Sequence, residues 1–157
     1  MMNFQMFSES VDMLDKYYQH LDRHLRGTRG WRIAPITDDV QHGVVSVGHY
    51  NIIDDTGKTL GRDTQIGKIQ RVYDSASDTL KLEHISAAFD ASGRKRIKGL
   101  RIVDTVYPFD VKFVVDNHIK HVIVDAVNPV TERKFVEHFR KAGFVVVKQG
   151  NKLIASK

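Results

Sequence analysis

The sequence has no cysteine among its 157 residues. This absence excludes disulfide bonds and metal sites built from thiolates, and it fits a reducing compartment. No apolar run approaches the roughly 20 residues that a membrane-spanning helix needs. The first five residues, MMNFQ, lack the basic and then apolar order of a signal peptide. We therefore expect a cytoplasmic protein that has no membrane segment.

Familiar catalytic and metal-binding motifs are also missing. The sequence contains no His-Glu-x-x-His metal motif, no Gly-x-Ser-x-Gly nucleophile elbow and no Gly-x-x-x-x-Gly-Lys-[Ser/Thr] phosphate loop. Of the eight histidines, His118 and His121 lie three residues apart, but they straddle a loop and the beginning of a strand. We therefore expect no metal site.

The composition is that of an ordinary folded domain, with 41% hydrophobic and 27% charged residues. The length fits one domain, residues 1–157, with a core of its own. Lys and Arg outnumber Asp and Glu by 24 to 19, which gives a net charge of +5. Such an excess favours anionic partners, such as nucleic acid, an acidic protein or a phosphorylated cofactor. It is equally compatible with a mildly basic surface that has no specific partner.

Residues 8–26 are expected to form a helix, because apolar side chains recur three and four positions apart. Ser8 or Ser10 could cap its beginning, and Gly27 lies where a helix often ends. The apolar side chains of this stripe are Val11, Leu14, Tyr18, Leu21 and Leu25.

Short strands rich in Val, Ile and Tyr follow this helix. Asp- and Gly-containing turns separate them, and their alternation of polar and apolar residues favours antiparallel pairing. The expected strands are residues 31–36, 43–53, 65–73 and 79–89, and the clearest turns are residues 54–58 and 74–78.

The second half alternates helices and strands. Pro108 leaves a kink or a later start open for the helix at residues 102–115. Asn128-Pro129 predicts the beginning of a second helix, which Gly143 ends. Strands are expected at residues 121–127, 144–148 and 152–155, and the edge at Leu153–Ala155 could pair with a second chain to form a homodimer. The fold class is therefore mixed α/β, or α+β, with a mostly antiparallel mixed sheet flanked by helices.

Three segments carry a resemblance to a known family. The segment Arg96-Ile97-Lys98-Gly99-Leu100-Arg101 follows a strand and resembles the loop [Gln/Arg]-x-x-Gly-x-[Gly/Ala]. The segment Phe139-Arg140-Lys141-Ala142-Gly143-Phe144 resembles Tyr-x-x-x-Gly-Phe at the end of a helix, and a strand ending at Asn128 lies between the two. With the order of elements, these segments resemble the GNAT superfamily of N-acetyltransferases.

The resemblance implies a domain that binds acetyl-CoA. A helix N-terminus attracts a pyrophosphate through unpaired N–H groups, and Gly99 would let the backbone approach. The alternative for this loop is a solvated basic turn. The residues implied to contact the cofactor are Ile85, Ala87, Arg94, Arg96, Ile97, Lys98, Gly99, Leu100, Arg101, Asn128 and Phe139.

Two departures from the family pattern bear on the chemistry. Arg101 replaces a small residue beside the diphosphate, where it could crowd the cofactor or bind its phosphates. Phe139 replaces the tyrosine that often protonates the departing thiolate, and a phenylalanine has no proton to donate.

Acetyl transfer to an amine needs alignment, an oxyanion partner and a base. Glu83 and His84 are the candidate bases, since the resemblance implies a base on the strand before the loop. Adjacent strand residues face opposite sides, so we expect only one of them to face the cleft. His138 is a candidate acid beside Phe139. The alternatives are a solvent-facing carboxylate for Glu83, a packed or surface imidazole for His84, and a surface histidine for His138.

The sequence thus predicts an N-acetyltransferase with an amine acceptor of unknown identity. The competing hypothesis is a GNAT-like binding protein without catalysis, which would hold nucleic acid or an acidic partner. Such a partner would contact the arginines after the first helix and the aromatic residues near them: Arg23, Arg26, Arg29, Arg32, Trp31 and Tyr17.

Overall fold

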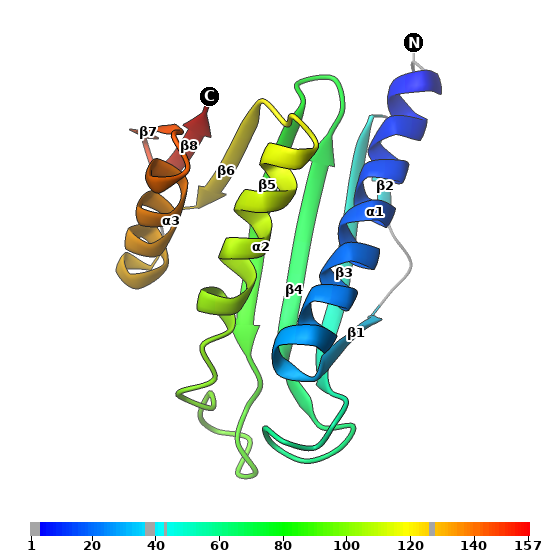
Figure 1. Ribbon diagram of the computed structural model, residues 1–157, viewed down its shortest axis with the longest axis vertical. Coiled ribbons are helices and arrows are strands. Elements are labelled where there is room, and N and C mark those ends of the chain that lie inside the picture. Colours follow the sequence, from blue (N-terminus) through cyan, green and yellow to red (C-terminus); the bar gives the residue numbers. More distant parts are fainter. Residues whose placement is uncertain (1–3, 37–39, 43, 126–127) are drawn as a thin grey trace.

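The computed structural model describes residues 4–36, 40–42, 44–125 and 128–157. Among these residues it forms one mixed sheet and three helices (Figure 1). The elements in chain order are α1 (Phe4–Arg29), β1 (Trp31–Pro35), β2 (Val40–His42), β3 (Val45–Asp54), β4 (Gln65–Asp74), β5 (Thr79–Ala87), α2 (Ile102–Asp116), β6 (His121–Asp125), α3 (Pro129–Lys141), β7 (Val145–Gln149) and β8 (Lys152–Ser156).

The sheet has the strand order β1-β3-β4-β5-β6-β8-β7, and β2 pairs with β3 outside this path. Every pair is antiparallel except β5 with β6, which α2 connects as a crossover. This topology confirms the predicted fold class, a mostly antiparallel mixed sheet with helices beside it. A parallel pair needs a crossover connection, and the late helices supply it.

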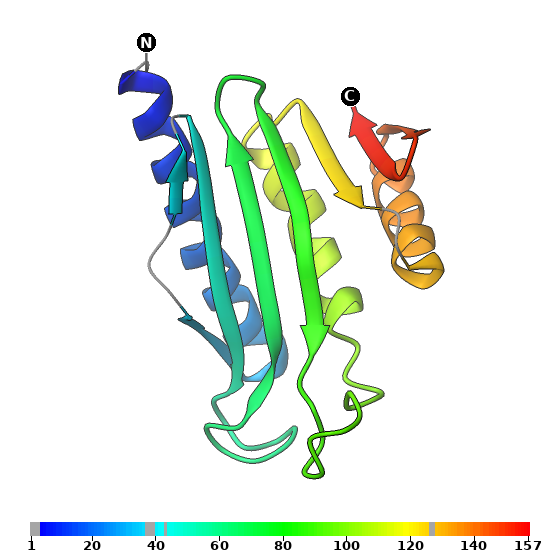
Figure 2. The same cartoon turned by 180° about the vertical axis from the view of Figure 1, so that it is seen from behind.

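The core lies between the sheet and the helices α1 and α2, which both cover one face of β3, β4 and β5 (Figure 2). The apolar stripe of α1 is buried there, as its spacing predicts, and α2 adds a second row. α3 packs against α2, β6 and β7. The buried side chains of the two rows are Leu14, Tyr17, Tyr18, Leu21 and Leu25 from α1 and Ile102, Val106, Phe109 and Phe113 from α2.

The first helix differs from its predicted bounds. It begins at Phe4 and ends at Arg29, so Ser8 and Ser10 lie inside it and Gly27 does not end it. Ser10 instead ties the helix to the sheet: its buried hydroxyl donates to the carbonyl of Val44 and accepts the N–H of Ser75. Tertiary hydrogen bonds therefore replaced the expected cap.

Two further predictions about helices and edges are settled. α2 begins at Ile102 and contains Pro108, so a later start after the proline is wrong. β8 lies between β6 and β7, so Leu153–Ala155 is not an edge, and the pairing with a second chain expected there is wrong. β7 forms that edge and exposes Val145 and Val147. None of the three described helices has the length and apolarity of a membrane span.

Several other boundaries agree with the sequence. α3 begins at Pro129, directly after its cap residue Asn128, whose side-chain oxygen accepts the N–H groups of Val130 and Thr131. Gly143 follows the helix with a positive φ of 92°, a conformation that favours glycine. The predicted ends of two strands, at residue 43 and at residues 126–127, lie outside the described residues.

Candidate active site

The strands β5 and β6 separate in the middle of the sheet. They pair only from Thr79 to Lys81, and β6 then diverges from β5 (Figure 2). From Leu82 onward, the outer edge of β5 faces no strand among the described residues. A bulge begins at the same place, since Gln70 pairs with His84 while Val72 pairs with Lys81. β5 therefore offers unpaired backbone groups at a bend, a feature often found beside active sites.

A buried ion pair holds this bend. Arg71 and Asp110 are fully buried, and their side chains are 2.9 Å apart. The Arg71 guanidinium also donates to the carbonyls of Gln70 at 3.1 Å and His84 at 3.5 Å. The hydroxyl of Tyr17 donates to Asp110 at 2.5 Å and accepts from Arg71 at 3.0 Å. α1, α2, β4 and the bulge of β5 thus share one charged network.

A cavity of about 210 Å³ lies on the helix side of β5, between this strand, the beginning of α2 and α3. Its walls combine the free end of β5 with the segment that resembles the acyl-CoA loop. The structure therefore brings together most of the residues that the resemblance implies. The predicted residues that line this cavity are Ile85, Ala87, Ile97, Gly99, Leu100 and Arg101.

The loop before α2 lines this cavity with Gly99, Leu100 and Arg101. Gly99 and Arg101 both have positive φ, 79° and 57°, and Arg101 is the residue before the helix. No side chain caps α2, and among the described residues the N–H groups of Lys98, Gly99 and Leu100 have no acceptor. A helix N-terminus with free N–H groups attracts an anion.

Arg29 fixes the position of this loop from the end of α1. Its guanidinium donates to the carbonyl of Leu100 at 2.9 Å and to the hydroxyl of Thr105 at 2.8 Å. It also stacks on Trp31, with 4.0 Å to the ring centroid. The loop therefore keeps a defined shape without using its own N–H groups.

The charges at the mouth of the cavity are mixed. Lys134 of α3 lines the cavity and pairs with Asp104 at 2.7 Å, and Arg101 lies 3.9 Å from the same carboxylate. Asp104 is in the first turn of α2, where its negative charge lowers the positive potential of the helix N-terminus. Neither Lys134 nor Asp104 was predicted from the sequence, because both lie outside the motif before α2 and Lys134 comes from α3.

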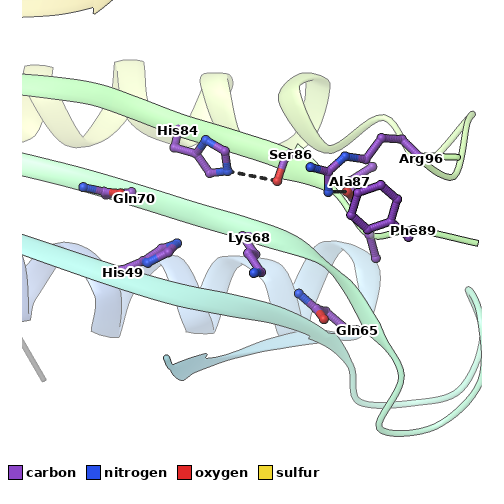
Figure 3. Close-up of a pocket in the computed structure, with 10 residues that line it drawn as sticks. His49, Gln65, Lys68, Gln70, His84, Ser86, Ala87, Phe89 and Arg96 are labelled. Carbon is purple, nitrogen blue, oxygen red and sulfur yellow. Dashed lines mark hydrogen bonds between the residues drawn. The ribbon is translucent and has the colours of Figure 1, made fainter. Parts of the chain in front are cut away.

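A second cavity, of about 370 Å³, lies on the other face of the sheet (Figure 3). Most of the residues that line it are polar or charged, and it shares Ser86 and Ala87 with the cavity on the helix side. The last residues of β5, Ser86 and Ala87, therefore separate the two cavities, and we call them the tail of β5. The residues that line the second cavity are His49, Gln65, Lys68, Gln70, His84, Ser86, Ala87, Ala88, Phe89 and Arg96.

His84 faces this second cavity, and Glu83 does not line it. The His84 Nε2 lies 2.9 Å from the hydroxyl of Ser86 (Figure 3). Partial burial, followed by His49 and the nearby cations, lowers the pKa of His84, so its imidazole is neutral at neutral pH. The Glu83 carboxylate pairs with Lys81 at 3.2 Å. Of the two candidate bases, His84 is the one that lines a cavity.

The other predicted site residues lie outside the cavity on the helix side. Arg94 is exposed at the end of a hairpin, and Arg96 lines the second cavity. Asn128 caps α3, and Phe139 is fully buried against Phe135 and Phe144.

Two other predicted residues lie near the site without forming its walls. His138 is half-buried and packs edge-on against Tyr107, with ring centroids 6.4 Å apart. Lys98 is exposed beside Gly99 and is not among the residues that line the cavity on the helix side.

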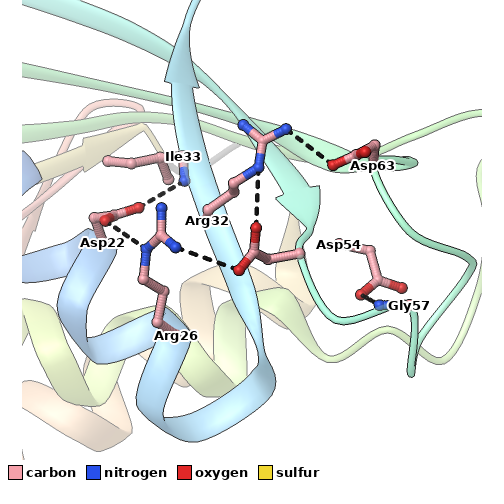
Figure 4. Close-up of polar contacts among 8 residues, drawn as sticks. Asp22, Arg26, Arg32, Ile33, Asp54, Gly57 and Asp63 are labelled. Atoms are coloured by element: carbon pink, nitrogen blue, oxygen red, sulfur yellow. Dashed lines mark hydrogen bonds and ion pairs between the residues drawn. The ribbon is translucent and has the colours of Figure 1, made fainter.

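The four arginines of the competing hypothesis lie in the C-terminal part of α1 and in β1, and they are largely bound within the molecule (Figure 4). Arg26 pairs with Asp22 at 2.8 Å and with Asp55 at 3.3 Å. Arg32 pairs with Asp55 and with Asp63, both at 3.3 Å. The aromatic residues of the same hypothesis, Trp31 and Tyr17, are fully buried. Of the four arginines, Arg23 alone forms no ion pair or hydrogen bond among the described residues.

The residues of the second cavity were not predicted to lie together, although a pattern in the sequence indicates that they do. Polar residues alternate with apolar ones in three neighbouring strands, at His49 and Asn51, at Lys68 and Gln70, and at His84 and Ser86. Residues two apart in a strand share a face. Within the described residues, no group of three or more His, Asp or Glu is arranged to hold a metal ion.

Comparison with models of known protein families and with curated proteins gives no match. Among solved structures, matches include the PaiA N-acetyltransferase from Thermoplasma acidophilum in complex with coenzyme A, at 17% identity and a TM-score of 0.40. The ribosomal-protein-S5-alanine acetyltransferase from Vibrio fischeri matches at 12% and 0.37, and the dodecameric spermidine N-acetyltransferase from Vibrio cholerae at 11% and 0.37.

These alignments cover 71%, 71% and 99% of this chain and 60%, 61% and 78% of the respective matching chains. The chain thus spans about 60% of the length of the first two.

Proposed function

We propose that this chain is a divergent GNAT-like N-acyltransferase, which moves an acetyl group from acetyl-CoA to an amine. The observation that carries this proposal is the tail of β5. This tail has a free outer edge, and it lies between a cavity that leads to the N-terminus of α2 and a second cavity that contains His84. A thioester on one side and an amine on the other would meet at this strand.

The residues on the helix side fit an acyl-CoA in part. The free N–H groups of Gly99 and Leu100 suit a pyrophosphate, and Lys134 and Arg101 add positive charge. Ile85 and Ala87 give an apolar wall beside β5. The cavity of about 210 Å³ takes the part of the donor beside the helix. Phe139 is buried, so it contacts no donor here.

The mechanism follows from His84 and the backbone of β5. The amine nitrogen attacks the thioester carbonyl carbon, and His84 takes the amine proton as the C–N bond forms. The carbonyl oxygen gains negative charge, which unpaired N–H groups of β5 stabilise. The C–S bond then breaks, and the proton on His84 passes to the departing thiolate. His84 thereby replaces the acid that the phenylalanine at position 139 cannot provide.

Acetyl-CoA binding tests the first half of this proposal. Acetyl-CoA at 100 times its dissociation constant stabilises a protein by about 2.7 kcal/mol, so the melting temperature should rise measurably. Gly99→Glu should abolish the shift, because it places a carboxylate where the phosphates would lie. Gly93→Glu is the matched control, since Gly93 has a similar φ of 71° and equally open surroundings. A chain that shows no shift with millimolar acetyl-CoA would refute the proposal.

Turnover is tested by release of the coenzyme A thiol. The chain has no cysteine, so a thiol reagent reports only the product. His84→Gln should lower kcat by about 100-fold or more while the acetyl-CoA shift remains, as expected for loss of a general base. An unchanged kcat would assign the base to another residue, with Glu83 as the next candidate.

The competing hypothesis of a nucleic-acid or acidic-protein surface has little support in the geometry. Its arginines Arg26 and Arg32 are paired with aspartates, and Arg29 is used to hold the loop before α2. These contacts make the arginines part of the first helix's attachment to the sheet.

A further inference from the structure

The second cavity has an unusual balance of charge. Its cations are Lys68 and Arg96, its imidazoles are His49 and His84, and its amides are Gln65 and Gln70. None of the described residues that line it is an aspartate or a glutamate. A cavity without carboxylates repels a polycation and attracts an anion.

Both cations have N–H groups that form no hydrogen bond among the described residues. Lys68 forms no ion pair or side-chain hydrogen bond among the described residues, although it lies on the central strand β4. The exposed Arg96 stacks on Phe89, with 3.9 Å to the ring centroid, and donates one N–H to the carbonyl of Ala87 at 2.8 Å. Its other N–H groups have no described partner. A guanidinium carries five donors, and it suits planar or tetrahedral oxyanions.

His49 adds an unsatisfied group. The His49 Nε2 is buried and has no hydrogen-bond partner among the described residues. Its ring lies edge-on to that of His84, with centroids 6.3 Å apart. Burial and, after it, Lys68 lower the pKa of His49. A bound anion would offset the charge of Lys68.

The two ends of the cavity differ (Figure 3). His84 pairs with Gln70, and Ser86 pairs with Lys68. Lys68 precedes Gln70 by two residues in β4. Two residues of a strand span about 7 Å. Arg96 and Phe89 lie beyond Ser86, at the end away from His84. The separation of His84 and Lys68 along the strands therefore matches the length of a short molecule.

We propose that the acceptor is a small primary amine that carries an anionic group, a phosphate or a carboxylate, with its nitrogen at His84 and its anion at Lys68 and Arg96. This inference rests on the proposed acyltransfer and names the substrate class of the same site. Polyamines do not fit, because the cavity would place their second charge beside Lys68 and Arg96.

Matched pairs of amines test the substrate class through thiol release. Phosphoethanolamine is compared with ethanolamine, and 4-aminobutyrate with butylamine, so that each pair differs in the anionic group. The anionic member should have a kcat/KM at least 10-fold higher, and the better of the two anionic amines identifies phosphate or carboxylate as the group bound. Spermidine, or an amine without an anionic group, that is equal to or better than the anionic amines would overturn the inference.

Variants tie this preference to the cavity. Lys68→Gln should lower kcat/KM for the preferred anionic amine by about 10-fold or more and should reduce its advantage over the matched amine that lacks the anionic group. Lys95→Gln is the control, because Lys95 is exposed in the neighbouring hairpin and does not line the cavity. Equal effects of the two variants would contradict the assignment.

The two proposals fail in distinguishable ways. The absence of any acetyl-CoA shift would refute the acyltransfer proposal. An intact shift with thiol release that favours spermidine would leave acyltransfer standing and refute the anionic acceptor. Binding of inorganic phosphate gives a readout without turnover: it should move the His84 ring signals in NMR spectra, assigned with His84→Gln. Lys68→Gln should weaken this binding, and unaltered His84 signals with millimolar phosphate would count against the anion site.

Discussion

Two loops at the same end of the sheet differ in whether their backbone N–H groups have hydrogen-bond acceptors (Figure 1). The loop between β3 and β4 closes around the buried Asp54, whose carboxylate accepts four N–H groups. The loop before α2 has no such carboxylate, and the N–H groups of Lys98, Gly99 and Leu100 are without acceptors among the described residues. The four donors around Asp54 are Gly57 at 2.9 Å, Thr59 at 2.9 Å, Leu60 at 2.7 Å and Gly61 at 3.1 Å.

This difference separates a loop whose N–H groups are bonded to its own carboxylate from a loop whose N–H groups stay free. The first loop carries its own anion, and Trp31 anchors it through a 2.9 Å hydrogen bond to Thr59. The second loop is held from outside by Arg29, so its donors stay available. A loop that is held in shape but keeps its donors free is therefore suited to an external anion.

The largest expected effect concerns the buried network that holds β5 between the two cavities. Asp110→Ala leaves the Arg71 guanidinium buried without a counter-charge and should lower the free energy of unfolding by about 3–5 kcal/mol. Urea denaturation measures the loss. The double variant Arg71→Met with Asp110→Leu removes both charges and should be more stable than Asp110→Ala. A single variant as stable as the parent would show that the pair does not hold the bend.

The next effect tests the closed loop. Asp54→Ala removes the acceptor of four N–H groups and should cost about 2 kcal/mol, since water replaces only part of these charged hydrogen bonds. Acetyl-CoA binding should stay unchanged, because this loop holds no external anion. Asp15→Ala, at an exposed position of α1, is the control and should stay within about 0.5 kcal/mol. A loss of acetyl-CoA binding in Asp54→Ala would break the contrast between the loops.

A smaller effect is expected in the dependence of stability on pH. Burial alone raises the pKa of Asp54, but the four backbone hydrogen bonds outweigh it, so the pKa lies below its ordinary value. A carboxylate with a depressed folded-state pKa stabilises the fold fully above the unfolded value, near pH 4, and loses this contribution as pH falls through the folded value. The stability of the parent should thus fall more steeply below about pH 4 than that of Asp54→Ala. Parallel curves would contradict the assigned pKa.

The fold was predictable in its order and largely in its elements, because periodicity reports the burial of side chains. The stripe of α1, the cap at Asn128 and the turn at Gly143 are local patterns that hold in the structure. The missed features depend on residues far apart in the chain. Arg71 meets Asp110 across 39 positions, and Ser10 bonds Val44 and Ser75. No periodicity reports such contacts, so the predicted cap at Ser10 was wrong.

The same limit explains the site. Ile85, Ala87 and Gly99 come together because the motif is local to one strand and the loop after it. Lys134 joins them from α3, and the second cavity draws on three strands and a hairpin. Arg96 sits at the motif position implied to face the cofactor, yet the hairpin at residues 89–96 turns it toward the second cavity. A motif therefore predicts where a loop lies better than it predicts the direction of the loop's side chains.

The smallest effect sharpens the contrast at the open loop itself. Asp104 places a negative charge in the first turn of α2, beside the free N–H groups. Asp104→Asn keeps the size of the side chain, removes the charge and frees Lys134 and Arg101 for an anion. A charge in the first turn is worth about 0.3–1 kcal/mol, so acetyl-CoA should bind about 2- to 5-fold more tightly at low salt.

Titration calorimetry at two salt concentrations measures the effect of Asp104→Asn, and the gain should shrink at the higher salt because the charges are screened. Asp116→Asn, at the other end of α2, is the control and should leave the affinity unchanged. Weaker binding in Asp104→Asn would mean that Asp104 serves to hold Lys134 in position. The loop before α2 would then resemble the closed loop around Asp54, with a carboxylate as part of its structure.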